Sequence, residues 1–212
     1  MKGSLLPYKN LVFDLGGVII DLAIERTIDA ISRLSGLTEA AIRKAYMHQP
    51  EFLAYEKGLI TDDEFRNALQ HIFSFKATVA VTDACWNAML AGLPKQKLEL
   101  LEKLGEHYHL TVLSNTNSIH LHHVNSAMLP AVSAHTSLNA YFNRHYYSHL
   151  VNKRKPEKEI FMQVLEESEF KPADTLFLDD NPENIAAAEV LGIHTRLITH
   201  PDNVYELFAA HE

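Results

Sequence analysis

Short apolar runs recur along the chain, separated by segments in which apolar residues return at helical spacing. Four runs have the Val, Leu, Ile, Phe and Thr content that is typical of buried parallel strands: Leu11–Phe13, Leu110–Leu113, Thr175–Leu178 and His194–Ile198. A fifth strand is expected at Arg144–Ser148. We therefore expect these runs to form one sheet that is buried on both faces.

Helices are predicted between these strands. The spacing indicates helices over Pro94–Glu106, Glu157–Ser168, Pro182–Leu191 and Asn203–Ala210. Asn181 before Pro182 is a typical helix start, and Gly192 after Leu191 is a typical helix stop. Because strands alternate with helices, we predict an α/β fold with a doubly wound, Rossmann-like parallel sheet.

The alternation fails between residues 21 and 93, where four segments carry helical spacing. Thr61 and Asp62, and later Thr82 and Asp83, supply residues that cap helix starts. We expect residues 21–93 to form an all-helical cap over the carboxyl ends of the strands. Residues 1–20 and 94–212 would then form the core, and ligands bind at that end of such sheets.

Composition narrows the range of partners. The chain has 212 residues, 47% of them apolar, and a formal net charge of −8. An acidic chain argues against a nucleic-acid partner, and no apolar run reaches the length of a membrane span. The first residues lack a signal-peptide pattern, so we expect a cytoplasmic protein. We also expect it to be a monomer or a homodimer. Cys85 is the only cysteine, which rules out an intrachain disulfide, and we expect it to be packed in a helix.

Polar residues with reactive side chains fall at or near predicted strand ends. Asp14 follows the first strand, Ser114 and Asn115 follow the second, and Asp179 and Asp180 follow the Thr175–Leu178 strand. Lys155 precedes a predicted helix. Strand ends at one edge of a parallel sheet converge. We therefore expect carboxylates, a hydroxyl and an ammonium in one pocket.

This combination suits phosphoryl transfer to a carboxylate. Asp14 can act as the nucleophile, and Mg²⁺ held by Asp14 and Asp180 would offset the repulsion between carboxylate and phosphate. Lys155 would neutralise further charge. The Ser114 hydroxyl and the backbone N–H groups of Leu15–Gly17 and Asn115 would hold the phosphate oxygens.

Four segments together resemble the motifs of the haloacid dehalogenase-like hydrolase superfamily: FDLGGVI, LSNTN, RKPEKEIF and FLDDNPENI. The helical insertion is similar to the small cap of that superfamily, and the nearest likeness is to bacterial phosphatases that act on α-D-glucose 1-phosphate. The resemblance implies a Mg²⁺-dependent phosphatase of a small phosphorylated metabolite. It implies Asp14 as nucleophile and metal ligand, the Gly16 carbonyl and Asp180 as metal ligands, Asp179 as a further ligand or supporting group, and Ser114 and Lys155 on the phosphate.

Gly16 departs from the family pattern. Most phosphatases of the superfamily carry there a second aspartate that protonates the leaving group and then activates water. One explanation is a leaving group that needs little protonation, such as the anomeric oxygen of a sugar 1-phosphate. In another, a different acid substitutes, and the candidates are Asp21, His48, Glu51 and Glu56. In a third, the protein is a catalytically weak phosphate-binding regulatory or interaction module.

Dehalogenation of 2-haloacids is a separate alternative. Dehalogenases of the superfamily also lack the second aspartate, but they lack the paired acids of the metal site as well. Asp179 and Asp180 are both present, which favours the phosphatase. Asn184 stands where many relatives carry another acid, and an amide can still bind a ligand or donate a hydrogen bond.

Two further segments have competing interpretations. The histidines of His120–His123 favour a packed or solvated helix over a zinc site, because no acidic or cysteine partner is nearby in the sequence. The segment YEKGLIT, with Tyr55, Glu56 and Gly58, is either a loop over the site or an interhelix turn that ends at Gly58.

Overall fold

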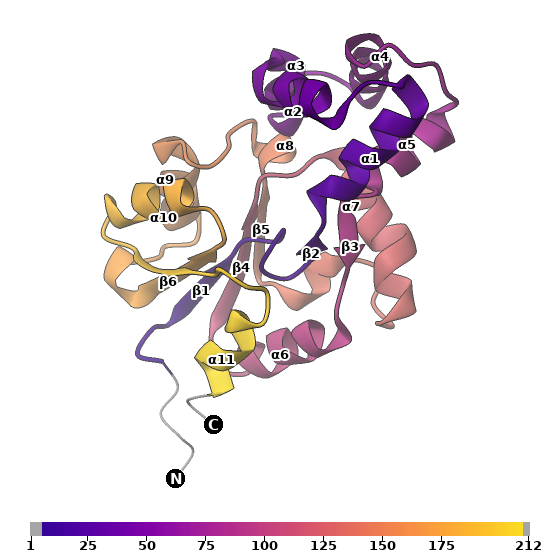
Figure 1. Ribbon diagram of the computed structural model, residues 1–212. Coiled ribbons are helices and arrows are strands. Elements are labelled where there is room, and N and C mark those ends of the chain that lie inside the picture. Colours follow the sequence, from indigo (N-terminus) through magenta and orange to yellow (C-terminus); the bar gives the residue numbers. More distant parts are fainter. Residues whose placement is uncertain (1–5, 210–212) are drawn as a thin grey trace.

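The computed structural model describes residues 6–209, and its centre is a five-stranded sheet (Figure 1). Its strands are β1 (Asn10–Phe13), β4 (His109–Ser114), β5 (Arg144–Tyr147), β6 (Thr175–Asp179) and β7 (His194–Leu197). They lie in the order β5-β4-β1-β6-β7 and every pairing is parallel. The predicted parallel α/β sheet, with all five of its strands, is confirmed.

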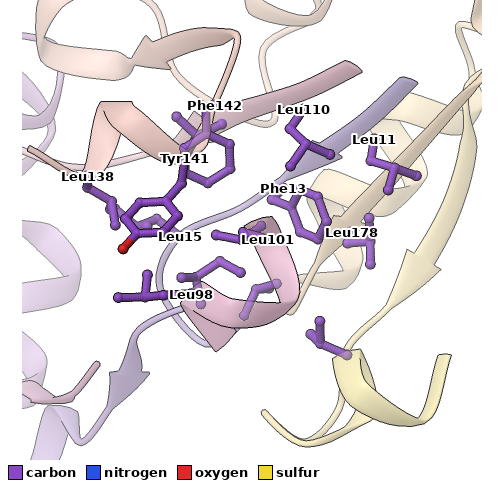
Figure 2. Packing of buried hydrophobic residues seen from close by; sticks show 14 of the residues in the cluster. Leu11, Phe13, Leu15, Leu98, Leu101, Leu110, Leu138, Tyr141, Phe142 and Leu178 are labelled. Carbon is purple, nitrogen blue, oxygen red and sulfur yellow. The ribbon is translucent and has the colours of Figure 1, made fainter. Parts of the chain in front are cut away.

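Alternate residues of β1 face opposite layers of helices. Leu11 and Phe13 pack with α6 (Lys95–Gly105) and α11 (Asn203–Ala209), whereas Val12 packs with α9 (Lys158–Glu167) and α10 (Pro182–Glu189). Figure 2 shows the first of these layers, with Leu98 and Leu101 of α6 near Phe13. Apolar side chains on both faces of a strand require cover on both faces, which is why the sheet is doubly wound.

Five helices lie over one end of the sheet (Figure 1). They are α1 (Ile24–Ser35), α2 (Glu39–His48), α3 (Pro50–Glu56), α4 (Asp62–Ile72) and α5 (Val79–Asn87). Their apolar faces form a cluster of their own, centred on aromatic residues such as Phe52, Phe65 and Trp86, and the core contributes Ile119 to it. A short antiparallel pair, β2 (Asp21–Leu22) and β3 (Leu90–Gly92), joins the two connecting segments. The division of the chain at residues 21 and 93 stays a prediction.

One of the two predicted helix starts in this region is wrong. Thr61 does cap α4, in a capping box with Glu64. Thr82, however, lies inside α5, which begins at Val79 and is capped by Thr78. The Thr82 hydroxyl donates to the Thr78 carbonyl oxygen at 3.1 Å, so its hydrogen bond is made within the helix instead of at its start.

Shorter elements follow β4, flank β5 and precede β6. The α-helical ones are α7 (Ser118–His123) and α8 (Ser148–Val151). The remaining turns are η1 (Val124–Met128), a π-helical turn, and the 3₁₀ turns η2 (Leu129–Ala131), η3 (Leu138–Tyr141) and η4 (Pro172–Asp174). Within the part of the chain that the structure describes, no helix has the length and apolar character needed to cross a bilayer.

Candidate active site

A buried triad of charges lies where β1 and β6 end. Asp14 directly follows β1, Asp179 is the last residue of β6, and the register of the two strands places them side by side. The Lys155 Nζ lies 2.8 Å from Asp14 Oδ1 and 2.6 Å from Asp179 Oδ2. The ammonium therefore bridges two carboxylates, and three of the residues predicted from the sequence meet at one point.

Asn115 holds the backbone of Lys155 in place. The Lys155 N–H donates to Asn115 Oδ1 at 2.9 Å, and Asn115 Nδ2 donates to the Lys155 carbonyl oxygen, also at 2.9 Å. This pair ties the end of β4 to the loop before α9. The Asn115 side chain is thus used to position the lysine, and only its backbone N–H is left for a ligand.

Asp180 completes a group of three acids. Carboxylate oxygens of Asp14, Asp179 and Asp180 lie within 4.8 Å of one another. The Asp180 carboxylate lies over Gly17, where a Cβ would come within 2.2 Å of its Oδ2. Gly17 also has a φ of +73°, which L side chains rarely adopt. The second glycine of the GG pair is therefore required by its own backbone and by the approach of Asp180.

Gly17 differs from its predicted role in phosphate binding. Its N–H donates to the Ile20 carbonyl oxygen at 2.8 Å. The Leu15 N–H interacts with the Asp14 carboxyl and favours its ionised form. Gly17 therefore accommodates Asp180 and does not offer its N–H to a ligand, because that group is already bonded within the turn.

The acidic cluster carries more negative charge than its lysine balances. Burial raises the pKa of Asp14 to about 7, against the opposing effect of Lys155, and Asp179 raises it further. Burial and Asp179 also raise the pKa of Asp180. Burial opposes the charge of Lys155, but Asp14 and Asp179 overcome it and raise the lysine pKa. Three carboxylates around one ammonium are a donor set that suits Mg²⁺, which prefers oxygen ligands.

Asp179 is more fully hydrogen-bonded than the other two acids. Its Oδ1 accepts from the Asn181 N–H at 2.8 Å, and Asn184 Nδ2 lies 3.0 Å from Oδ1 and 3.1 Å from Oδ2. Asn184 Oδ1 is buried and has no hydrogen-bond partner among the described residues. A buried acceptor beside three acids fits a water or a metal-bound water, which is a second sign that the site accommodates a hydrated cation.

A small cavity opens beside this cluster, between the helical region and the sheet. Its volume is about 170 Å³. Leu15, Gly16, Ser114 and Asn115 line its base, and Glu56 of α3 is one of the residues from the helical region. The predicted phosphate-binding positions thus border a space that the helical region closes.

A side chain at Gly16 would have to displace the end of the Leu22 side chain. A Cβ at this position would lie 2.8 Å from Leu22 Cδ1. Of the predicted substitutes, Asp21 pairs with Lys97 at 2.8 Å, His48 is exposed, and neither of them nor Glu51 lines the cavity. Glu56 does line it.

One neighbouring contact was not predicted. Arg154 Nε donates to Glu56 Oε2 at 2.9 Å, across 98 residues of sequence. His120 is buried, stacks on Trp86 with ring centroids 5.1 Å apart, and pairs with Asn87. His120 thus serves packing, in line with the interpretation favoured for His120–His123. The only sequence signal for Arg154 was its place in the RKP segment beside Lys155.

Comparison with known proteins identifies the family. A family model described as haloacid dehalogenase-like hydrolase matches residues 8–192. The chain belongs to this family. A D-ribitol-5-phosphate phosphatase of Bacteroides thetaiotaomicron is 34% identical over 189 residues, which cover 88% of this chain and 90% of the relative.

Solved structures agree with the assignment. The HAD family enzyme bt-2542 of B. thetaiotaomicron, in complex with magnesium and inorganic phosphate, is 38% identical with a TM-score of 0.81, covering 90% of this chain and 93% of its own. L-2-haloacid dehalogenase of Xanthobacter autotrophicus is 20% identical, with a TM-score of 0.57 over 89% of this chain and 76% of its own, and shares the fold alone. The predicted family, its α/β fold and its assignment as a phosphatase are confirmed.

Proposed function

We propose that this phosphatase hydrolyses phosphate monoesters of small sugars or polyols, with Mg²⁺, through an aspartyl-phosphate on Asp14. The observation that supports this most is the position of Asp14. It is a buried carboxylate at a strand end, in contact with Lys155 and within reach of Asp180, and the residue after it borders the cavity.

Each contact of the cluster has a use in this reaction. Asp14 Oδ would attack phosphorus and the bond to the leaving oxygen would break. Lys155 would offset charge on the phosphoryl oxygens, since its ammonium already lies 2.8 Å from Asp14. The Ser114 hydroxyl and the N–H groups of Gly16 and Asn115 would bind those oxygens at the base of the cavity. Water would then cleave the bond between Asp14 and phosphorus.

The metal would be held by Asp14, Asp180 and the Gly16 carbonyl, with Asp179 fixed behind them by Lys155 and Asn184. When bound, Mg²⁺ supplies positive charge that lets a carboxylate approach a phosphate dianion. The excess negative charge of the cluster and the unpaired Asn184 oxygen support this assignment.

The substrate class follows from the cavity and from the relatives. A space of about 170 Å³, bordered by the helical region, suits a metabolite of a few carbons. The relative acts on a pentitol 5-phosphate according to its name, whereas the sequence resemblance points to a sugar 1-phosphate. Both belong to the class of small polyhydroxylated monoesters.

Phosphate release from a panel of substrates tests the proposal. The panel contains D-ribitol 5-phosphate, α-D-glucose 1-phosphate, glucose 6-phosphate and p-nitrophenyl phosphate, each with Mg²⁺ or with EDTA. We expect Mg²⁺-dependent release by the wild type and a loss of about 10³-fold or more in Asp14→Asn. Asp29→Asn, a carboxylate-to-amide change on the exposed face of α1, is the matched control and should retain full activity.

Two results would contradict the proposal. Equal release by wild type and Asp14→Asn would remove Asp14 as nucleophile. No release from any ester, together with chloride release from 2-chloropropionate, would favour the dehalogenase instead.

A further inference from the structure

The structure leaves the acid–base group of the reaction unassigned. Gly16 has no side chain, and Leu22 lies where one would extend. A primary alkyl ester such as a pentitol 5-phosphate has a poor leaving group, so its cleavage needs a proton donor. General acid–base help is worth about 10²–10⁴-fold. The donor must border the cavity and hold its proton near neutral pH.

Glu56 satisfies the first condition. It is the last residue of α3, and it borders the same cavity as Gly16 and Ser114. Among the described residues that line this space, Glu56 is the one carboxyl group. It therefore borders, from the helical region, the space next to the proposed phosphate position.

The surroundings of Glu56 favour its protonated form, which is the direction that the second condition requires. Burial raises its pKa, against the opposing effects of Arg154 and Lys155. Tyr46 is a further ionisable group beside it, and burial together with Glu56 raises the pKa of this tyrosine to about 12. His120 also borders the cavity, but burial lowers its pKa to about 3, so it carries no proton to donate as an imidazolium.

Contacts with the segment before α9 hold Glu56 in place. Arg154 donates to its Oε2 at 2.9 Å. The next residue, Lys57, pairs with Glu157 at 2.5 Å, and the Lys57 carbonyl accepts from Asn152 Nδ2 at 2.8 Å. These partners all belong to the segment that carries Lys155. The carboxyl is thus positioned by the same loop that positions the phosphate-binding lysine.

We propose that Glu56 is the general acid and base of this enzyme, supplied by the helical region in place of the side chain that Gly16 lacks. The proposal rests on the proposed function. As Asp14 attacks phosphorus and the P–O bond to the substrate breaks, the Glu56 carboxyl gives its proton to the departing oxygen, and the alcohol leaves. The Glu56 carboxylate then takes a proton from water as the water oxygen attacks phosphorus. Asp14 and inorganic phosphate are released, and Glu56 is protonated again.

Substrates with two kinds of leaving group distinguish an acid–base role of Glu56 from a structural role. In Glu56→Gln we expect turnover of an alkyl phosphate, D-ribitol 5-phosphate or whichever panel ester the wild type cleaves best, to fall about 10²-fold or more. p-Nitrophenolate leaves without a proton, so the first step with p-nitrophenyl phosphate should stay fast while water attack is slowed. Stopped-flow absorbance should then show a burst of p-nitrophenol equal to the enzyme present, followed by slow turnover.

Two matched variants are measured beside Glu56→Gln. Glu51→Gln makes the same change on the same helix, outside the cavity, and should leave both substrates unaffected. Arg154→Ala removes the contact to Glu56 but keeps the carboxyl, and should lower the rates of both substrates by a similar factor without a burst.

Two results would overturn the assignment. Wild-type turnover of the alkyl ester by Glu56→Gln would exclude the role. An equal loss on both substrates without a burst, as in Arg154→Ala, would reduce Glu56 to a positioning contact. Activity in the wild type that vanishes in Asp14→Asn, alongside either result, would show that the proposed function stands and that this inference alone has failed.

Discussion

At the scale of the residue, the main feature of the site is negative charge that the neighbouring ammonium balances only in part. Asp14, Asp179 and Asp180 share one ammonium, and burial leaves Asp14 with a pKa of about 7. Such a group is costly to ionise without a further positive charge. The same feature that would make the metal-free cluster unfavourable thus prepares it to bind a cation.

This charge predicts how Mg²⁺ binding depends on pH. In the proposed site the Asp14 carboxylate is a metal ligand, and below pH 7 that carboxyl holds a proton that the metal would have to displace. The apparent affinity should therefore fall as the pH is lowered from 8 to 6, by about tenfold for one proton. Calorimetric titration of the wild type and of Asp14→Asn at both pH values measures this. Equal affinities of the wild type at pH 6 and pH 8 would show that Asp14 does not titrate against the metal.

At the scale of the element, the turn after α3 is docked on α8 by a close backbone contact. Gly58 has a φ of +66°, and a Cβ there would lie 2.1 Å from the His149 carbonyl oxygen. Gly36, at the end of α1, has a φ of +72°, and a Cβ there would meet no atom of another part of the chain within 4 Å. Two glycines with the same backbone conformation therefore differ in whether another part of the chain lies against them.

Replacing each glycine with alanine isolates the contact. Gly36→Ala should cost about 1 kcal/mol of unfolding free energy, because of its left-handed backbone. Gly58→Ala should cost more, since its clash is with backbone, and it should also raise the KM for alkyl phosphates by moving Glu56 away from the cavity. Urea unfolding and steady-state kinetics measure the two effects. If both variants lost the same stability and kept wild-type kinetics, the turn would have no part in closing the site.

At the scale of the whole molecule, the acids of the proposed site come from the ends of the strands, and Glu56 comes from the helical region above them. The five strands and the acids at their ends were predictable because each is signalled locally, by an apolar run and the polar residue that ends it. The capping of α5 by Thr78 was missed because two threonines compete within five residues. The pairing of Arg154 with Glu56 and the covering of Gly16 by Leu22 depend on how distant segments pack, and no local pattern specifies them.

The proposed reaction depends on one covalent bond, which forms between Asp14 and phosphorus. Acid quenching of the wild type during turnover, followed by peptide mass analysis, tests it directly. We predict one phosphoryl group on the peptide that contains Asp14, present with Mg²⁺ and substrate, and absent with EDTA. Continued phosphate release by Asp14→Asn at the wild-type rate, with no phosphorylated peptide in either protein, would contradict the account.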